Sequence, residues 1–194
     1  DGRAYSVREF GAVGDGTTDD TAALQSAINT LMGTDGLGDG GTILFPPGTY
    51  LISGALTIPN NGSATNPTQP SLRLVGQGTS ANGRWLTVPQ GASVLDMRYN
   101  ATVAKIDTRG FGVLEIEHLI LADNGSDAAV FIQTTNTTLR IHDCAFIGTA
   151  SATSAVNDAI VLGGTDSTGH GGALSTSPFQ GYGSVIRDNF FSKI

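Results

Sequence analysis

Three short segments of this chain place ionisable side chains at matching positions. Ile116 and Ile141 begin two of them and lie 25 residues apart, and Ile186 begins a third after a longer step of 45 residues. Steps in this range are typical of the stacked coils of a repeat fold. The residues that directly follow the three isoleucines are Glu117, His142 and Arg187. Stacked coils would place these three side chains side by side in one outward ladder. A carboxylate, an imidazole and a guanidinium group would then be adjacent, and such groups can bind charged ligands and transfer protons.

Asp143 and Asp188 come directly after the ladder, at the expected turn of each coil. On neighbouring coils their carboxyl groups would approach the separation of roughly 5 to 5.5 Å that retaining glycosidases use, whereas inverting enzymes need a wider gap. Crowding of two acids also raises one pKa, as an acid catalyst requires. We therefore predict Asp143, Asp188, Glu117 and His142 as catalytic candidates. The alternative is that aspartates at turns hydrogen-bond to nearby backbone groups.

Three further residues are candidates for substrate binding: Arg187, Trp85 and His170. Trp85 is the only tryptophan of the chain, and in its loop it would either stack on a sugar ring or cover an edge of the core. The acidic residues near the N-terminus lack the D-x-D-x-D-G spacing of a calcium loop. We predict no metal site and no cofactor.

An amphipathic helix and a pair of short strands precede the ladder. Side-chain oxygens that could satisfy the first N–H groups of a helix come from Thr17, Thr18, Asp19 and Asp20. The apolar face that follows consists of Leu24, Ala27, Ile28 and Leu31. Glycines between 33 and 41 end this helix. Strands are then predicted at Thr42 to Phe45 and at Tyr50 to Ile52, separated by a Pro-Pro-Gly turn.

The rest of the chain is predicted to be short strands and turns. The strands are expected at Leu72 to Val75, Val94 to Met97, Val103 to Ile106 and Ala159 to Leu162. In the coil alignment, Ile116, Ile141 and Ile186 stack inside, and so do Leu121, Phe146 and Phe191. Residues 148–183, rich in Gly, Ser, Thr and Ala, would form a surface loop between two coils.

The run V-R-E-F-G-A-V-G-D-G-T-T-D-D-T-A-A-L-Q-S-A-I followed by G-G-T-I-L-F-P-P-G-T-Y-L-I, within residues 7–52, resembles the opening of the pectate-lyase-like superfamily. This superfamily includes phage tailspikes, polygalacturonases and β-1,3-glucanases. The resemblance implies an all-β fold, a right-handed parallel β-helix with an N-terminal capping helix. It also implies a polysaccharide partner. His170 lies in a G-H-G segment that looks like one in polygalacturonases, but the N-x-D, D-D and R-x-K elements that accompany it there are missing.

Composition narrows the possible partners and locations. A formal net charge of -7 and a pI near 4.6 argue against nucleic acid as the main partner, because phosphate binding relies on clustered Lys and Arg. The sequence contains no apolar run long enough to insert into a membrane. Cys144 is the only cysteine, so no disulfide can form within the chain.

We predict one domain over residues 1–194, as the N-terminal part of a longer chain. Residues 1–58 would form the cap and first coil, and residues 71–194 the later coils. Three functions stay open. The first is recognition, with or without cleavage, of a polysaccharide by a phage tailspike or tail fibre, in the virion and as a possible homotrimer. The second is a secreted polysaccharide lyase or glycoside hydrolase, and the third is a structural or adhesive β-helix without catalysis.

Overall fold

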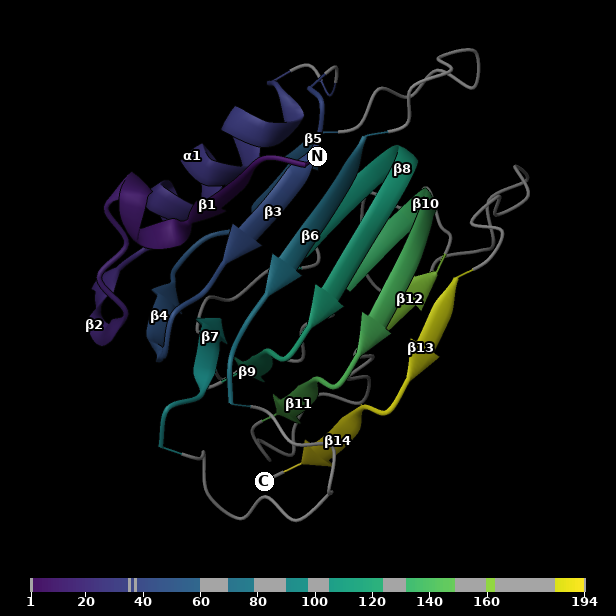
Figure 1. Cartoon of the computed structure of the whole chain (residues 1–194). Helices are drawn as coiled ribbons and strands as arrows, with labels where there is room; N and C mark the ends of the chain where they lie inside the picture. The colour runs from purple at the N-terminus through teal and green to yellow at the C-terminus, as the bar shows by residue number, and fades with distance from the viewer. Residues whose placement is uncertain are drawn as a thin grey trace.

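The computed structural model describes residues 2–34, 36, 38–59, 70–78, 90–97, 105–123, 132–148, 160–162 and 184–193. Every strand pair in this part of the chain is parallel, and strands that are neighbours in a sheet are usually distant in sequence. This is the arrangement of a parallel β-helix, in which the chain returns to the same face once per coil (Figure 1). The fold class predicted from the sequence is confirmed.

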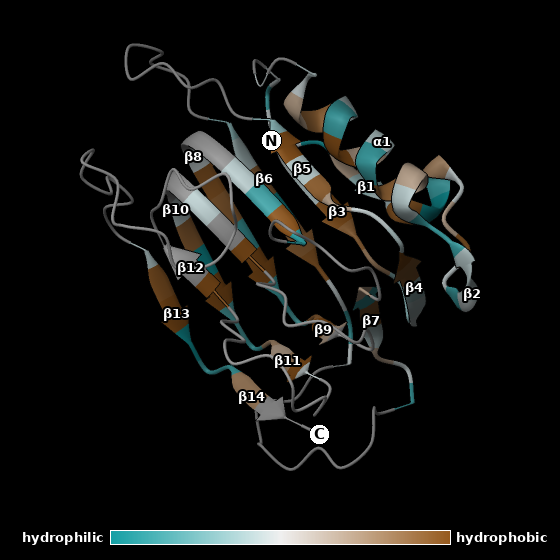
Figure 2. Ribbon diagram, turned by 180° about the vertical axis from the view of Figure 1, so that it is seen from behind, coloured by the Kyte–Doolittle hydropathy of each residue, from teal (hydrophilic) through white to brown (hydrophobic). Residues whose placement is uncertain are grey.

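A small cap covers one end of the stack. It contains the strand β1 (Ala4–Ser6), the 3-10 helix η1 (Val7–Phe10), the strand β2 (Asp15–Asp19) and the helix α1 (Thr21–Met32). Figure 1 shows α1 lying beside β1, β3 and β5, at the end opposite β13 and β14. The helix is amphipathic, with hydrophilic and hydrophobic residues alternating along it in Figure 2.

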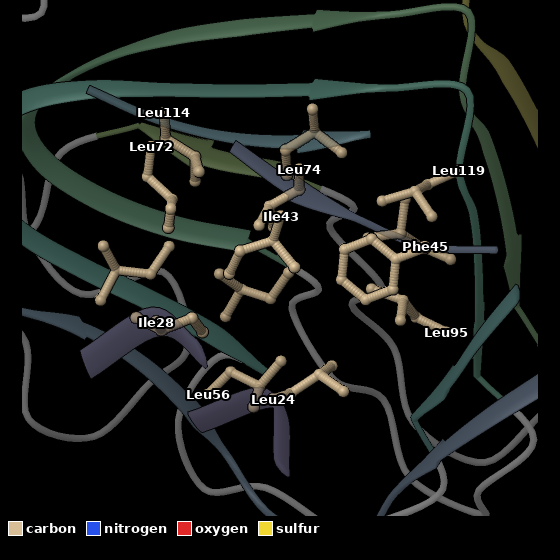
Figure 3. Close-up of a cluster of buried hydrophobic side chains, with 14 of the residues drawn as sticks. Leu24, Ile28, Ile43, Phe45, Leu56, Leu72, Leu74, Leu95, Leu114 and Leu119 are labelled. Atoms are coloured by element: carbon tan, nitrogen blue, oxygen red, sulfur yellow. The ribbon is translucent and has the colours of Figure 1, made fainter. Parts of the chain in front are cut away.

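The predicted apolar face of α1 is buried as expected. It consists of Leu24, Ala27, Ile28, Leu31 and, in addition, Met32. Figure 3 shows Leu24 and Ile28 facing strand residues such as Ile43, Leu56 and Leu72. Full burial of one such side chain contributes about 1.5 to 3 kcal/mol. The helix therefore seals the first coil, whose apolar interior would otherwise meet water.

The helix start agrees with the prediction in part. Thr17, Thr18 and Asp19 belong to β2, but Asp19 Oδ1 accepts a hydrogen bond from the N–H of Thr21, the first residue of α1, at 3.0 Å. The N-cap residue Asp20 makes no capping hydrogen bond with its side chain. Its carboxylate instead accepts hydrogen bonds from the backbone N–H groups of Val13 (2.7 Å) and Gly14 (3.0 Å). Buried Asp20 thus anchors the loop before β2, a tertiary contact that capping preferences do not reveal.

The strands form two sheets. The first contains, in spatial order, β1, β3 (Gly41–Leu44), β6 (Ser71–Val75), β8 (Ile106–Glu117), β10 (Ile132–His142) and β12 (Ile160–Leu162), with β5 (Leu56–Pro59) paired to β8 and β13 (Val185–Arg187) paired to β10. The second contains β2, β4 (Gly48–Ile52), β7 (Ser93–Met97), β9 (Ile120–Asp123), β11 (Ala145–Gly148) and β14 (Phe190–Lys193).

The long strands β8 and β10 each serve two faces. The first part of β8 pairs with β5, and its last five residues pair with β6. The register between β8 and β10 shifts between Thr135 and Thr137, which marks the corner between the two parts. The last part of β10 then pairs with β13. The last parts of β8 and β10, which carry the ladder, thus form one of three faces of the coil.

The predicted coil alignment is confirmed residue by residue. Ile141 lies opposite both Ile116 and Ile186, and Phe146 lies opposite both Leu121 and Phe191. The burial prediction holds for the inner coils but is wrong for the last, where Ile186 is 41% and Phe191 is 53% exposed. Within the described residues, β13 and β14 each pair on one side only.

The other predicted strands are found with small changes. Of the strand expected at residues 103–106, residues 103 and 104 lie outside the described residues, and Ile106 is the first residue of β8. Of the predicted loop at residues 148–183, the structure describes Gly148 and the strand β12, whose existence was predicted. None of the helices in the described part of the chain is long and apolar enough to span a membrane.

Candidate functional site

The outer sides of the two sheets are very different. On the second sheet the outward residues Val94, Ile120 and Ala145 are apolar, lie in register and are buried in a small cluster of their own. On the first sheet the outward residues of β6, β13 and the paired last parts of β8 and β10 are polar or charged, apart from three valines. They are Ser71, Arg73, Val75, Val113, Glu115, Glu117, Thr138, Arg140, His142, Val185 and Arg187. The charged outer side of the first sheet is therefore the candidate functional surface.

The predicted ladder exists. His142 on β10 lies opposite Glu117 on β8 and Arg187 on β13. Alternation along each strand turns their neighbours Ile116, Ile141 and Ile186 to the other side of the sheet, where the first two are fully buried. The buried stack of isoleucines thus sets the positions of the charged groups outside.

Asp143 and Asp188 occupy the turn that follows, on neighbouring coils as predicted. His118, Asp143 and Asp188 adopt left-handed backbone conformations, with φ of 55°, 54° and 54°, a region that Asp and His tolerate better than most residues. The next residue, Asn189, makes the bonds to backbone: its side chain accepts from the Cys144 N–H at 3.0 Å and donates to the Ile141 carbonyl at 2.9 Å. These residues therefore have a structural role, since they form and stabilise the stacked turns between the two sheets.

The ladder residues are joined in an ion-pair network. His142 Nδ1 lies 3.0 Å from Asp143 Oδ2, and His142 Nε2 lies 3.4 Å from carboxylate oxygens of both Glu115 and Glu117. Arg73 pairs with Glu115 at 3.6 Å and makes a closer ion pair with Glu117. With its side chain only 8% exposed, Glu117 lies beneath these partners. Such partners offset the cost of burying a carboxylate.

The hydrogen bond with His142 lowers the pKa of Asp143 below its ordinary value. The ionised form is favoured because it accepts this bond and lies near positive charge. The direction is opposite to the raised pKa that a proton-donating acid would need. Asp143 therefore suits the role of a base or of an anion that orients His142.

Arg73 and Glu115 were not among the predicted site residues. Glu115 could have been found, because residues two apart on a strand face the same side and Glu117 was already a candidate. Arg73 lies opposite Glu115 in the sheet, but it is distant in sequence and no repeat of constant length connects the two. Two predicted substrate-binding residues, Trp85 and His170, lie outside the described residues.

Glu115, Glu117 and His142 have the donor atoms of a metal site. The two carboxylate oxygens and the imidazole nitrogen all lie within 4.8 Å of one another.

Comparisons with known proteins give three informative similarities. Mannuronan C5-epimerase AlgE2 of Azotobacter vinelandii is 40% identical over 74 residues, which cover 38% of this chain and 7% of that protein. Alginate lyase 7 of the same organism is 34% identical over 146 residues, covering 66% of this chain and 16% of the lyase. The chain thus spans a small part of the relatives' length. Among solved structures, ORF18 of Geobacillus virus E2 has a TM-score of 0.51 at 25% identity, over 75% of this chain and 25% of that one.

A family model covers almost the whole chain. The model described as rhamnogalacturonase A/epimerase, pectate lyase-like, matches residues 4–193. This range includes the cap, both sheets and all the residues of the charged surface. The chain therefore belongs to the rhamnogalacturonase A/epimerase family of pectate lyase-like proteins.

Proposed function

We propose that the charged outer side of the first sheet binds an extended polysaccharide. The observation that carries the proposal is the ladder of Glu117, His142 and Arg187, on three consecutive coils. Coils in a parallel stack are about 4.8 Å apart, so the ladder presents hydrogen-bonding groups at a regular short spacing. An extended polymer can meet several such groups at once, and each contact adds to the affinity.

Two further observations support a polysaccharide as partner. The relatives include enzymes named for mannuronan and alginate, both of them sugar polymers. The outward residues Val94, Ile120 and Ala145 of the second sheet are buried, whereas Arg73 of the first sheet and Arg187 and Asp188 at its edge are about half exposed. The first sheet is the one that offers charged groups to a ligand.

Binding can be tested with a panel of polysaccharides that includes mannuronan, alginate and neutral glucans, by isothermal titration calorimetry. We expect Arg187→Glu to weaken binding of a ligand found in this way, because it reverses the charge of a ladder residue whose side chain is about half exposed. Arg3→Glu is the matched control, since Arg3 is a similarly exposed arginine, paired with Asp39 near the cap. Equal effects of the two changes, or no binding by any polymer, would contradict the proposal.

Cleavage of the bound polymer is a second candidate function. It is favoured by the contact between His142 and Asp143, an arrangement in which a carboxylate orients an imidazole for proton transfer. A lyase would release products with a new double bond that absorbs in the ultraviolet, and a glycoside hydrolase would release new reducing ends. Loss of product formation in Asp143→Asn, with polymer binding retained, would identify Asp143 as part of the machinery. Binding without either product would favour an adhesive role.

A more specific version of the proposal is that the protein binds its polysaccharide as part of a virion. The solved structure with a TM-score of 0.51 is a virus protein, and tailspikes were one of the functions predicted from the sequence. In this case the protein would act outside the host cell and as a homotrimer. Native mass spectrometry measures the oligomeric state directly, and a monomer would favour a secreted enzyme or binder instead.

A further inference from the structure

Three donor atoms converge within the charged surface. Glu115 Oε1 and Glu117 Oε2 each lie 3.4 Å from His142 Nε2, and each of the three residues has a donor atom within 4.8 Å of donor atoms of the other two. The fold sets this arrangement rigidly. The two glutamates are alternate residues of β8, and His142 is paired in register with Glu117 across the β8–β10 ladder.

The far side of each of these groups is already held by another residue. Arg73 pairs with the other oxygen of each glutamate, Glu115 Oε2 and Glu117 Oε1. The other nitrogen of the imidazole, His142 Nδ1, lies 3.0 Å from Asp143 Oδ2. A histidine that binds a metal characteristically donates its second N–H to a carboxylate, which fixes the ring and its tautomer. Asp143 and Arg73 orient the three donors in this way.

His142 Nε2 lies 3.4 Å from one carboxylate oxygen of each glutamate, and Arg73 pairs with the other oxygen of each. A cation among these three atoms would be attracted by both carboxylates and could be bound by the imidazole nitrogen.

We propose that Glu115, Glu117 and His142 bind a divalent transition metal ion of the zinc class. Imidazole nitrogen together with carboxylate oxygen suits zinc and its neighbours, whereas calcium and magnesium prefer oxygen ligands alone. The two carboxylates balance the charge of the cation, and Arg73 lies on their outer oxygens. Three protein ligands leave a fourth position for water or for an oxygen of a sugar. The proposal rests on the ion-pair geometry and holds whether or not the surface binds a polysaccharide.

Calorimetric titration of the tag-free, EDTA-treated protein with zinc chloride tests the proposal. We expect one zinc ion per chain and a rise in the melting temperature on binding. Both effects should be lost in His142→Gln, with affinity falling at least about tenfold. His118→Gln is the matched control, because His118 lies nearby, 3.9 Å from Glu117, but outside the converging set. Far-UV circular dichroism establishes that each variant is folded, and Glu115→Gln provides a second ligand variant.

Several results would overturn the proposal. Failure of the folded wild type to bind zinc would show that the cluster is an ion-pair network without a metal. Zinc binding that survives in His142→Gln and Glu115→Gln would place the ion elsewhere. Calcium that displaces zinc at equal concentration would exclude a nitrogen ligand. Polysaccharide binding measured on the same samples separates failure of this proposal from failure of the proposed function.

Discussion

The stacked isoleucines allow a matched test of how the coils are stabilised. Ile141 is fully buried between Ile116 and Ile186, whereas Ile186 lies opposite Ile141 and is 41% exposed. Truncation to alanine removes the same three carbon atoms at both positions. The two variants therefore differ in environment and not in chemistry.

The expected magnitudes follow from this burial. At about 0.8 kcal/mol for each buried carbon, the Ile141→Ala change loses about 2.4 kcal/mol of transfer free energy. The rigid neighbours leave a cavity, which raises the expected cost to about 3 to 4 kcal/mol. At Ile186 roughly three fifths of the side chain is buried and solvent can enter, so we expect about 1 to 1.5 kcal/mol.

The free energy of unfolding is measured for both variants by urea denaturation followed by circular dichroism. Ile116→Ala, at a second fully buried position of the same stack, is the control and should match Ile141→Ala. A cost at Ile186 as large as that at Ile141 would refute the reasoning. It would mean that the last coil is covered as completely as the inner ones.

Three other predictions concern the cap and the interior. Leu24→Asp should unfold the cap, because it buries an unpaired charge on the inner face of α1, whereas Ser26→Asp on the exposed face should leave the melting temperature nearly unchanged. Burial raises the pKa of the Cys144 thiol to about 12, so we expect labelling by a thiol reagent at pH 8 to be slow until denaturant is added. Hydrogen bonds from Ser53 and Thr21 lower the pKa of Asp19 to about 2, so its stabilising effect is present above the ordinary Asp pKa and is lost as the pH falls toward 2. The difference in melting temperature between wild type and Asp19→Asn should therefore shrink from pH 6 to pH 3, and a constant difference would contradict this account.

Much of the fold could be predicted from local pattern. The apolar spacing of α1 predicts its buried face, and the spacing of apolar residues in three segments predicts the register of three coils. Both follow from short-range geometry, because the periods of helix and strand decide which side chains share a face. The strand β5 and the two-part strands β8 and β10 were missed, since their boundaries depend on which coil they meet and not on their own residues.

The site was predictable only in part, because some of its contacts depend on the neighbouring coil and not on the local sequence. The sequence alone determined that Glu117, His142 and Arg187 share a ladder, because equal positions within a repeat stack on one another. Tertiary structure alone brought Arg73 to Glu115 and Glu117, since the coil between them has an irregular length that hides the relation. It also decided the direction of the Asp143 pKa, because a hydrogen bond from His142 outweighs any repulsion that spacing alone would suggest. Local sequence sets which face a side chain lies on, whereas the charge it meets there depends on the neighbouring coil.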